Sequence, residues 1–154
     1  MLEKMLPRKL IAASFTTSVY TILLALMLPN PLGKPIQTND DYLSNFFLSI
    51  CVYFFYVFIS VFLYGVIASL VTEYIVEKGK LRPPLLFLTL GHLAFGLPLW
   101  IVSLIPGLLF LIFDQSVKRR NHRHDSKLIT ISFILPTCVF LFGFFMFRYA
   151  FTAS

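Results

Sequence analysis

The chain has 154 residues, of which 58% are hydrophobic and 13% charged, and its net charge is +6. Soluble domains carry about 25% charged residues. A soluble fold of this composition would leave large apolar patches in water, so the composition excludes a soluble domain. The thirteen cations lie at the ends of long apolar runs, where they would face lipid headgroups, and this is not a nucleic-acid-binding pattern. We therefore expect a single membrane domain that contacts the lipid bilayer and no nucleic acid.

The first apolar run extends from Leu10 to Leu28 and follows a basic start, MLEKMLPRKL. Secretory signals also begin this way, but this run has spanning length and no small-residue cleavage site follows it. It therefore predicts an uncleaved first span over residues 10–29. The run is rich in hydroxyl groups, and part of this set should face protein and form interhelical hydrogen bonds. The hydroxyl-bearing residues are Ser14, Thr16, Thr17, Ser18, Tyr20 and Thr21.

The second apolar run, Tyr42 to Thr72, contains no charged residue over 31 positions. A helix of that length would measure about 46 Å, against about 30 Å for the hydrocarbon core of a bilayer. We expect a tilted span over residues 46–68. A proline-rich loop precedes the run, and a basic connection over residues 73–82 follows it.

The third run, Leu85 to Phe113, has 29 uncharged residues but contains Pro98 and Pro106. Prolines are tolerated in a span when neighbours satisfy the freed carbonyls, so the run predicts a kinked span over residues 87–110. The last run predicts a fourth span over residues 128–147. The expected fold class is an all-α integral membrane protein, a bundle of four transmembrane helices whose third member is kinked or re-entrant.

The distribution of Lys and Arg leaves the path of the third run open. With four crossings and a cytoplasmic N-terminus, seven cations face inward and six outward, which gives almost no orientation signal. If the third run enters and leaves on the same side, the count becomes eleven to two. The nearly equal numbers of cations on the two sides would also be compatible with copies of the protein that insert into the membrane in both orientations. Hydropathy favours four crossings of the cell membrane, because re-entrant backbone needs protein cover that a short chain hardly supplies.

His92 is the one residue inside an apolar run that titrates near neutral pH, which marks it as a candidate functional residue of the membrane interior. No Asp or Glu lies in any run to pair with it, so a neutral histidine bonded to a neighbouring helix is the favoured role. A basic loop after the third run should face lipid headgroups. Its cations are Lys118, Arg119, Arg120, Arg123 and Lys127.

The sequence contains no paired carboxylates, phosphate-binding loop or zinc-protease motif. General acid–base and nucleophilic chemistry both need such a constellation. We therefore expect no catalytic residue, no cofactor, no bound metal and no enzymatic activity.

The four apolar runs, the opening MLEKMLPRKL and the phenylalanine-rich texture resemble, over the whole length, the small uncharacterised four-span membrane proteins of bacilli. The resemblance implies a plasma-membrane location and supplies no activity. Two function classes stay open. The favoured one is an accessory or interaction protein whose partners are other membrane proteins or a second copy. The alternative is a small oligomeric transporter that uses His92 and the hydroxyls of the first span, and the missing carboxylate inside the runs argues against it.

Overall fold

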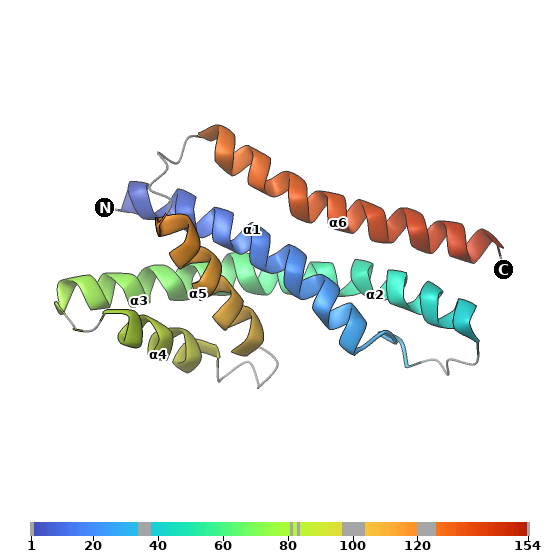
Figure 1. Ribbon diagram of the computed structural model, residues 1–154, viewed down its shortest axis with the longest axis horizontal. Helices are drawn as coiled ribbons and strands as arrows, with labels where there is room; N and C mark the ends of the chain where they lie inside the picture. The colour runs from blue at the N-terminus through green and yellow to red at the C-terminus, as the bar shows by residue number, and fades with distance from the viewer. Residues whose placement is uncertain are drawn as a thin grey trace.

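The computed structural model describes residues 2–33, 38–80, 82, 84–96, 104–119 and 126–153. These residues form helices and no strand, which confirms the all-helical fold class (Figure 1). In chain order the elements are α1 (Leu2–Met27), α2 (Asn39–Ile59), the π-helix η1 (Ser60–Gly65), α3 (Val66–Lys78), α4 (Pro84–Gly96), α5 (Leu104–Arg119) and α6 (Ser126–Ala153).

The elements α2, η1 and α3 form one continuous helix, because the residues on both sides of η1 keep α-helical backbone angles. A capping box fixes its start: the Asp41 N–H donates to Thr38 Oγ1 at 3.1 Å, and the Thr38 N–H donates to Asp41 Oδ2 at 3.0 Å. No proline interrupts the chain before α3 ends at Lys78. Beyond that end, Lys80 has a left-handed φ of 50°.

Three helical segments in the described residues are long and apolar enough to cross a membrane: Met5–Met27, Asp41–Lys78 and Ile129–Thr152. The third apolar run differs from the expected single kinked helix, because it forms α4, with 13 residues, and α5, with 16. At 1.5 Å per residue these helices measure about 20 Å and 24 Å, which is shorter than the hydrocarbon core. A bundle of four spanning helices is therefore not confirmed.

The sequence explains where the short helices begin. Pro84 is the first residue of α4 and Pro106 lies in the first turn of α5, where a missing N–H leaves no hydrogen bond unmade. The predicted span 87–110 is thus divided between two helices, and Pro98 lies outside the described residues. The predicted spans 10–29, 46–68 and 128–147 fall on α1, on the continuous helix and on α6, except that α1 ends at Met27.

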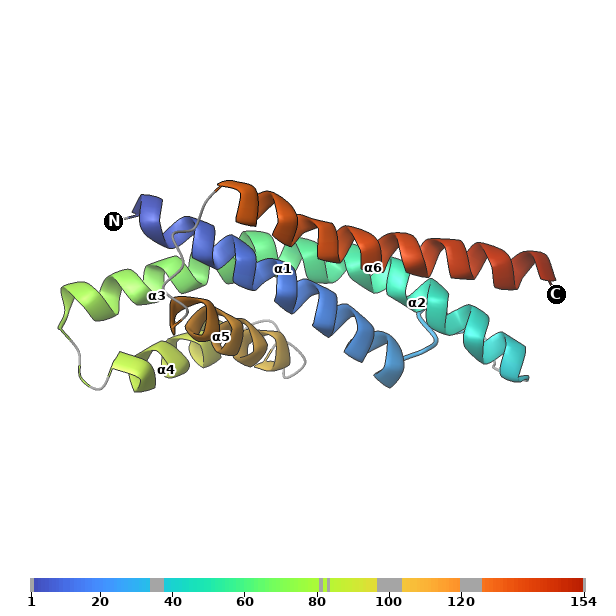
Figure 2. The same ribbon diagram turned by 45° about the horizontal axis from the view of Figure 1, so that its top comes forward.

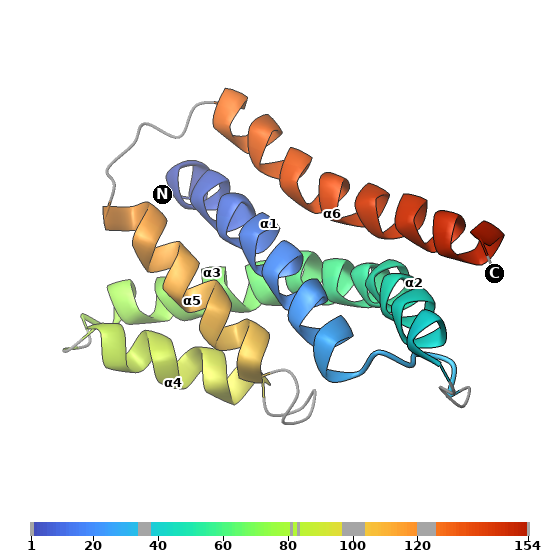
Figure 3. The ribbon, with the colours of Figure 1, turned by 45° about the vertical axis from the view of Figure 1, so that its right-hand side comes forward.

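The helix α1 occupies the centre of the bundle, where it packs against α2, α3, α5 and α6 (Figure 2). Of its apolar window 56% is buried, against 22% and 17% for the other two candidate spans, so α1 is the span most shielded by protein. The helices α4 and α5 run antiparallel to each other, and α4 packs against α3 while α5 packs against the first half of α1 (Figure 3).

The bundle therefore has two distinct halves. The N-terminal half contains the start of α1 together with α3, α4 and α5. The C-terminal half contains the end of α1, most of α6, and α2, and it ends near the C-terminus (Figure 1). The buried cluster of Ala12, Ala13, Tyr20, Val57, Val61, Val66 and Phe110 joins the two halves.

Candidate functional site

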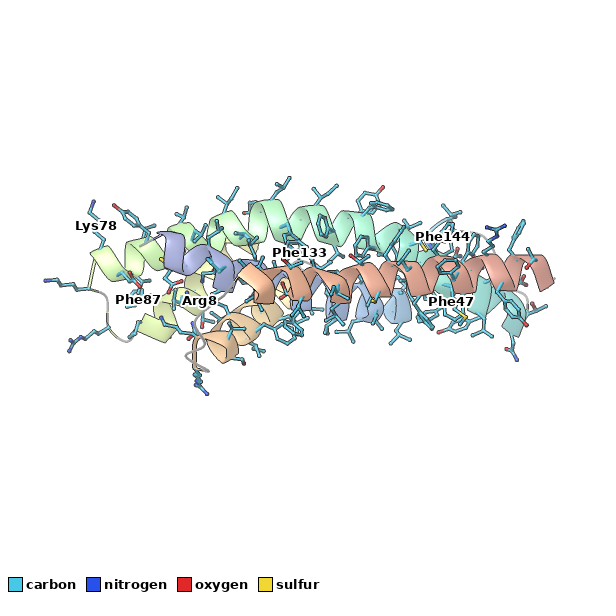
Figure 4. All side chains as sticks on the ribbon, turned by 90° about the horizontal axis from the view of Figure 1, so that it is seen from above. Arg8, Phe47, Lys78, Phe87, Phe133 and Phe144 are labelled. Atoms are coloured by element: carbon cyan, nitrogen blue, oxygen red, sulfur yellow. The ribbon has the colours of Figure 1, made fainter. Side chains whose placement is uncertain are left out.

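Four charged side chains meet inside the N-terminal half: Arg8 and Lys9 of α1, Glu73 of α3 and Asp114 of α5. Their exposed fractions are 9%, 1%, 3% and 1%, so all four are buried. Lys118 of α5 reaches Glu73 from the rim and is 48% exposed. These five residues are called the ion-pair cluster, and Figure 4 shows its Arg8 toward the same end of the bundle as Lys78.

Each of the two central cations bridges both acids. Arg8 Nε donates to Asp114 Oδ1 at 2.8 Å, and Arg8 Nη2 donates to Glu73 Oε2. Lys9 Nζ lies 2.8 Å from Asp114 Oδ2 and 2.7 Å from Glu73 Oε2. Lys118 Nζ lies 3.4 Å from Glu73 Oε1. All four carboxylate oxygens therefore contact a cation.

Local sequence places these groups. Arg8 and Lys9 are adjacent on α1 and lie within about 100° of each other around the helix, and both side chains reach α3 and α5. Asp114 and Lys118 are four residues apart and share one face of α5. Phe113 stacks on Phe15 of α1, with ring centroids 5.6 Å apart, and this contact holds α5 against α1 beside the cluster.

Energetically, a buried ion pair is a constraint more than a source of net stability. Desolvation offsets much of the attraction, yet removal of one partner typically costs about 3–5 kcal/mol because a buried charge is left uncompensated. Here the two acids face three cations, and the surplus charge belongs to the half-exposed Lys118. The ion-pair cluster thus ties α1, α3 and α5 into one arrangement.

The hydroxyl-bearing residues of α1 are all buried, which confirms that this set faces protein. Ser14 and Ser18 do not form the expected interhelical hydrogen bonds. Both hydroxyls donate within α1, that of Ser14 to the Leu10 carbonyl at 3.1 Å and that of Ser18 to the Ser14 carbonyl at 2.9 Å. Four buried hydroxyl oxygens have no hydrogen-bond partner within the described part of the chain. They belong to Thr16, Thr17, Thr21 and, on α3, Ser69.

The predicted site residues have different outcomes. His92 lies in α4, but its side chain is outside the described residues, so its role stays a prediction. Lys118 belongs to the ion-pair cluster through its contact with Glu73, and Arg119 is exposed at the end of α5. Of the remaining loop cations, Arg120 and Arg123 lie outside the described residues, and only the backbone of Lys127, in α6, is described.

Sequence reasoning missed Arg8, Lys9, Glu73 and Asp114. It assigned the two cations to the headgroup region, where they would be solvated, and this is wrong because both are buried. It found no acid within an apolar run, yet Glu73 and Asp114 each follow directly on one. One signal could have pointed to them: on a re-entrant path, for which the cation count is eleven to two, all four residues would lie on one side of the membrane.

No family model, curated protein or solved structure matches the chain. What the ion-pair cluster does must therefore follow from its own chemistry. With every carboxylate oxygen in contact with Arg8, Lys9 or Lys118, the cluster is arranged to join helices.

Proposed function

We propose that the protein is an accessory or interaction protein of the plasma membrane, with three crossings and a re-entrant hairpin formed by α4 and α5. The closed ion-pair cluster carries this proposal. A carrier of cations or protons needs a charged group that can exchange its partner, and intramembrane acids serve that purpose in many transporters. Glu73 and Asp114 instead have both of their oxygens engaged by side chains of the same chain.

The same cluster supports the re-entrant path. Lys118 contacts Glu73, so the chain leaves α3 and α5 at the same end of the bundle. On this path the third run makes no net crossing, and eleven of the thirteen cations share the side of the N-terminus. The positive-inside rule then orients the N-terminus toward the cytoplasm and the C-terminus outward. The neighbouring α1 and α3 supply the protein cover that a re-entrant segment requires.

The outward faces of the long helices favour the interaction class. Tyr56 of α2 is 70% exposed and Tyr149 of α6 is 73% exposed. The buried ions and hydroxyls lie on the opposite, inner side of the bundle. What the protein presents to its surroundings is therefore broad apolar and aromatic surface, suited to lipid and to the helices of a partner.

Cysteine accessibility in intact cells tests the topology. Cys51 and Cys138 are first replaced by Ser, and single cysteines are placed as Gly79→Cys, Ser126→Cys and Thr152→Cys in separate variants. With an impermeant thiol reagent, the first two should be protected and the third should react. Reaction of Ser126→Cys with protection of Gly79→Cys would instead establish four crossings. Partial reaction of every variant would indicate insertion in both orientations.

Photo-crosslinking tests the function class, with a photoreactive residue in place of one tyrosine at a time. Tyr56 and Tyr149 report on the outward faces, and Tyr20, 4% exposed in α1, is the matched internal control. In native membranes the two outward positions should give a discrete adduct with one other membrane protein or with a second copy, and Tyr20 should not. Adducts with lipid alone, together with solute flux through liposomes that contain the purified protein, would contradict the proposal.

A further inference from the structure

The π-helix η1 lies in the middle of the continuous helix, between α2 and α3. At its end the Val66 N–H donates to the Val61 carbonyl, five residues back, where an α-helix would bond four back. A π-helical turn accommodates one residue more than the α-helical turn that it replaces. It therefore rotates every later side chain about the helix axis by about 100°, which is the angle that one residue spans in an α-helix.

The burial pattern across η1 shows the consequence of that rotation. Glu73 lies 18 residues after Phe55, which is about five turns of an α-helix, so an unbroken helix would point both side chains the same way. Phe55 is 56% exposed, whereas Glu73 is 3% exposed. The same comparison holds on the buried face, where Val57 is 5% exposed and Ile75, also 18 residues on, is 53% exposed. The buried position is instead Val76, one residue later, at 5%.

A second contact depends on the same rotation. Thr72 of α3 faces Gly91 of α4 so closely that a Cβ added to Gly91 would lie 2.2 Å from Thr72 Cγ2. Glu73 and Thr72 are adjacent in the chain, so a single turn of α3 directs one residue at α1 and the other at α4.

We infer that η1 is the element that sets the register of α3, turning Glu73 inward to close the ion-pair cluster and seating Thr72 on Gly91. If the same residues formed an α-helix without the π-helical turn, the Glu73 carboxylate would lie on the outward face with Phe55. There it would be exposed to lipid without a partner, and Arg8 and Lys9 would lose one of their two acids. This inference concerns the fold of the cluster and holds whichever function class applies.

A disulfide between α3 and α4 provides the readout. In a background with Cys51→Ser and Cys138→Ser, the pair Thr72→Cys and Gly91→Cys is introduced. A Cβ at Gly91 would lie 3.2 Å from Thr72 Cβ, close to the spacing of about 3.5–4.5 Å found in disulfides. The substitution of Thr72 also removes one of the two side-chain branches that approach Gly91. The disulfide is detected after mild oxidation by mass spectrometry of the linked peptides.

Two length changes then test the register. Deletion of Leu63, an exposed residue of η1, removes the extra residue and leaves the direction of α3 unchanged, so the disulfide should still form. Insertion of one alanine after Ile67 rotates α3 by about 100°, and disulfide formation should fall to the level of a single-cysteine variant. The matched control is one alanine inserted after Gly79, beyond α3, which should leave the disulfide intact.

Either of two results would overturn the inference: loss of the disulfide on deletion of Leu63 in a protein that still inserts into membranes, or retention of it after the insertion at Ile67. If the insertion variant fails to accumulate, a pair of deletions decides the question. Deletion of Leu63 alone should keep the disulfide, and deletion of both Leu63 and Tyr64 should lose it. Equal behaviour of these two variants would contradict the role of η1.

Discussion

The two halves of the bundle are held together by different means. In the N-terminal half, the ion-pair cluster and the contact between Thr72 and Gly91 join the helices. In the C-terminal half, phenylalanine rings of α2 and α6 contact one another, as Phe47 and Phe142 do, and Figure 4 shows Phe47 in this half. The first half depends on a few specific partners, and the second depends on many similar contacts.

The aromatic contacts run along the whole interface between the continuous helix and α6. Ring centroids are 5.9 Å apart for Phe47 and Phe142, 5.1 Å for Phe54 and Phe140, and 5.2 Å for Phe62 and Phe133. Each such pair contributes about 0.5–1.5 kcal/mol beyond its burial. Because the pairs are numerous and alike, loss of one should be tolerated. Loss of one buried ion should not be, since its buried partners are then left with fewer counter-ions than the pairing requires.

The largest expected effect is in the ion-pair cluster. Asp114→Ala leaves Arg8 and Lys9 with Glu73 as their single acid, and should destabilise the protein by about 3–5 kcal/mol. Thermal unfolding of the purified protein in detergent measures the change. The matched control is Glu77→Gln, an exposed acid one turn beyond Glu73 on α3, which should leave the transition unchanged. Equal shifts for the two variants would remove the distinction between the halves.

An intermediate effect is expected where α3 meets α4. Gly91→Ala places a methyl group 2.2 Å from Thr72 Cγ2, and overpacking of this kind costs about 1–3 kcal/mol. Thr72→Ser removes the Cγ2 atom and keeps the hydroxyl, which donates to the Ala68 carbonyl at 2.8 Å. The double variant should therefore recover part of the lost thermal stability, because Thr72 Oγ1 still lies 2.9 Å from the added methyl group. A double variant as unstable as Gly91→Ala alone would show that this contact does not seat α4.

The smallest effect belongs to the aromatic half. Phe140→Leu keeps an apolar side chain but loses the ring contacts with Phe54, at 5.1 Å, and Phe55, at 5.3 Å. With each contact at the lower end of the range of about 0.5–1.5 kcal/mol, we expect a loss of about 1 kcal/mol in the free energy of unfolding. Phe145→Leu, at a position that is 61% exposed, serves as the control and should cost less. A loss at Phe140 as large as that at Asp114 would mean that the aromatic contacts are also individually required.

Much of the fold follows from the sequence because it rests on local signals. Long uncharged runs predict apolar helices, and Pro29 and Pro31 end the first of them near its observed end at Met27. The third run was harder, since hydropathy records the length of an apolar segment and not whether it turns back. The division into α4 and α5 depends on packing against α1 and α3, which no local pattern encodes.

The candidate site was beyond local reasoning for a related reason. Arg8 lies 65 residues from Glu73 and 106 residues from Asp114 in the chain. Each charge taken alone fits a solvated position at the end of an apolar run, and only tertiary packing makes it a buried partner. The rotation at η1 adds to the difficulty. A regular α-helix that continues from Phe55 would place Glu73 on the outward face.

A double-mutant cycle between Lys9 and Asp114 measures whether these buried charges act as one unit. Lys9→Met, Asp114→Leu and the double variant are purified, and their free energies of unfolding are compared in the same detergent. Each single change leaves a buried charge with fewer partners, whereas the double change removes a neutral pair and leaves Arg8 with Glu73. If the buried charges act as one unit, the double variant should lose less stability than the sum of the two single losses, by more than about 1 kcal/mol. Losses that add to within about 0.5 kcal/mol would contradict it.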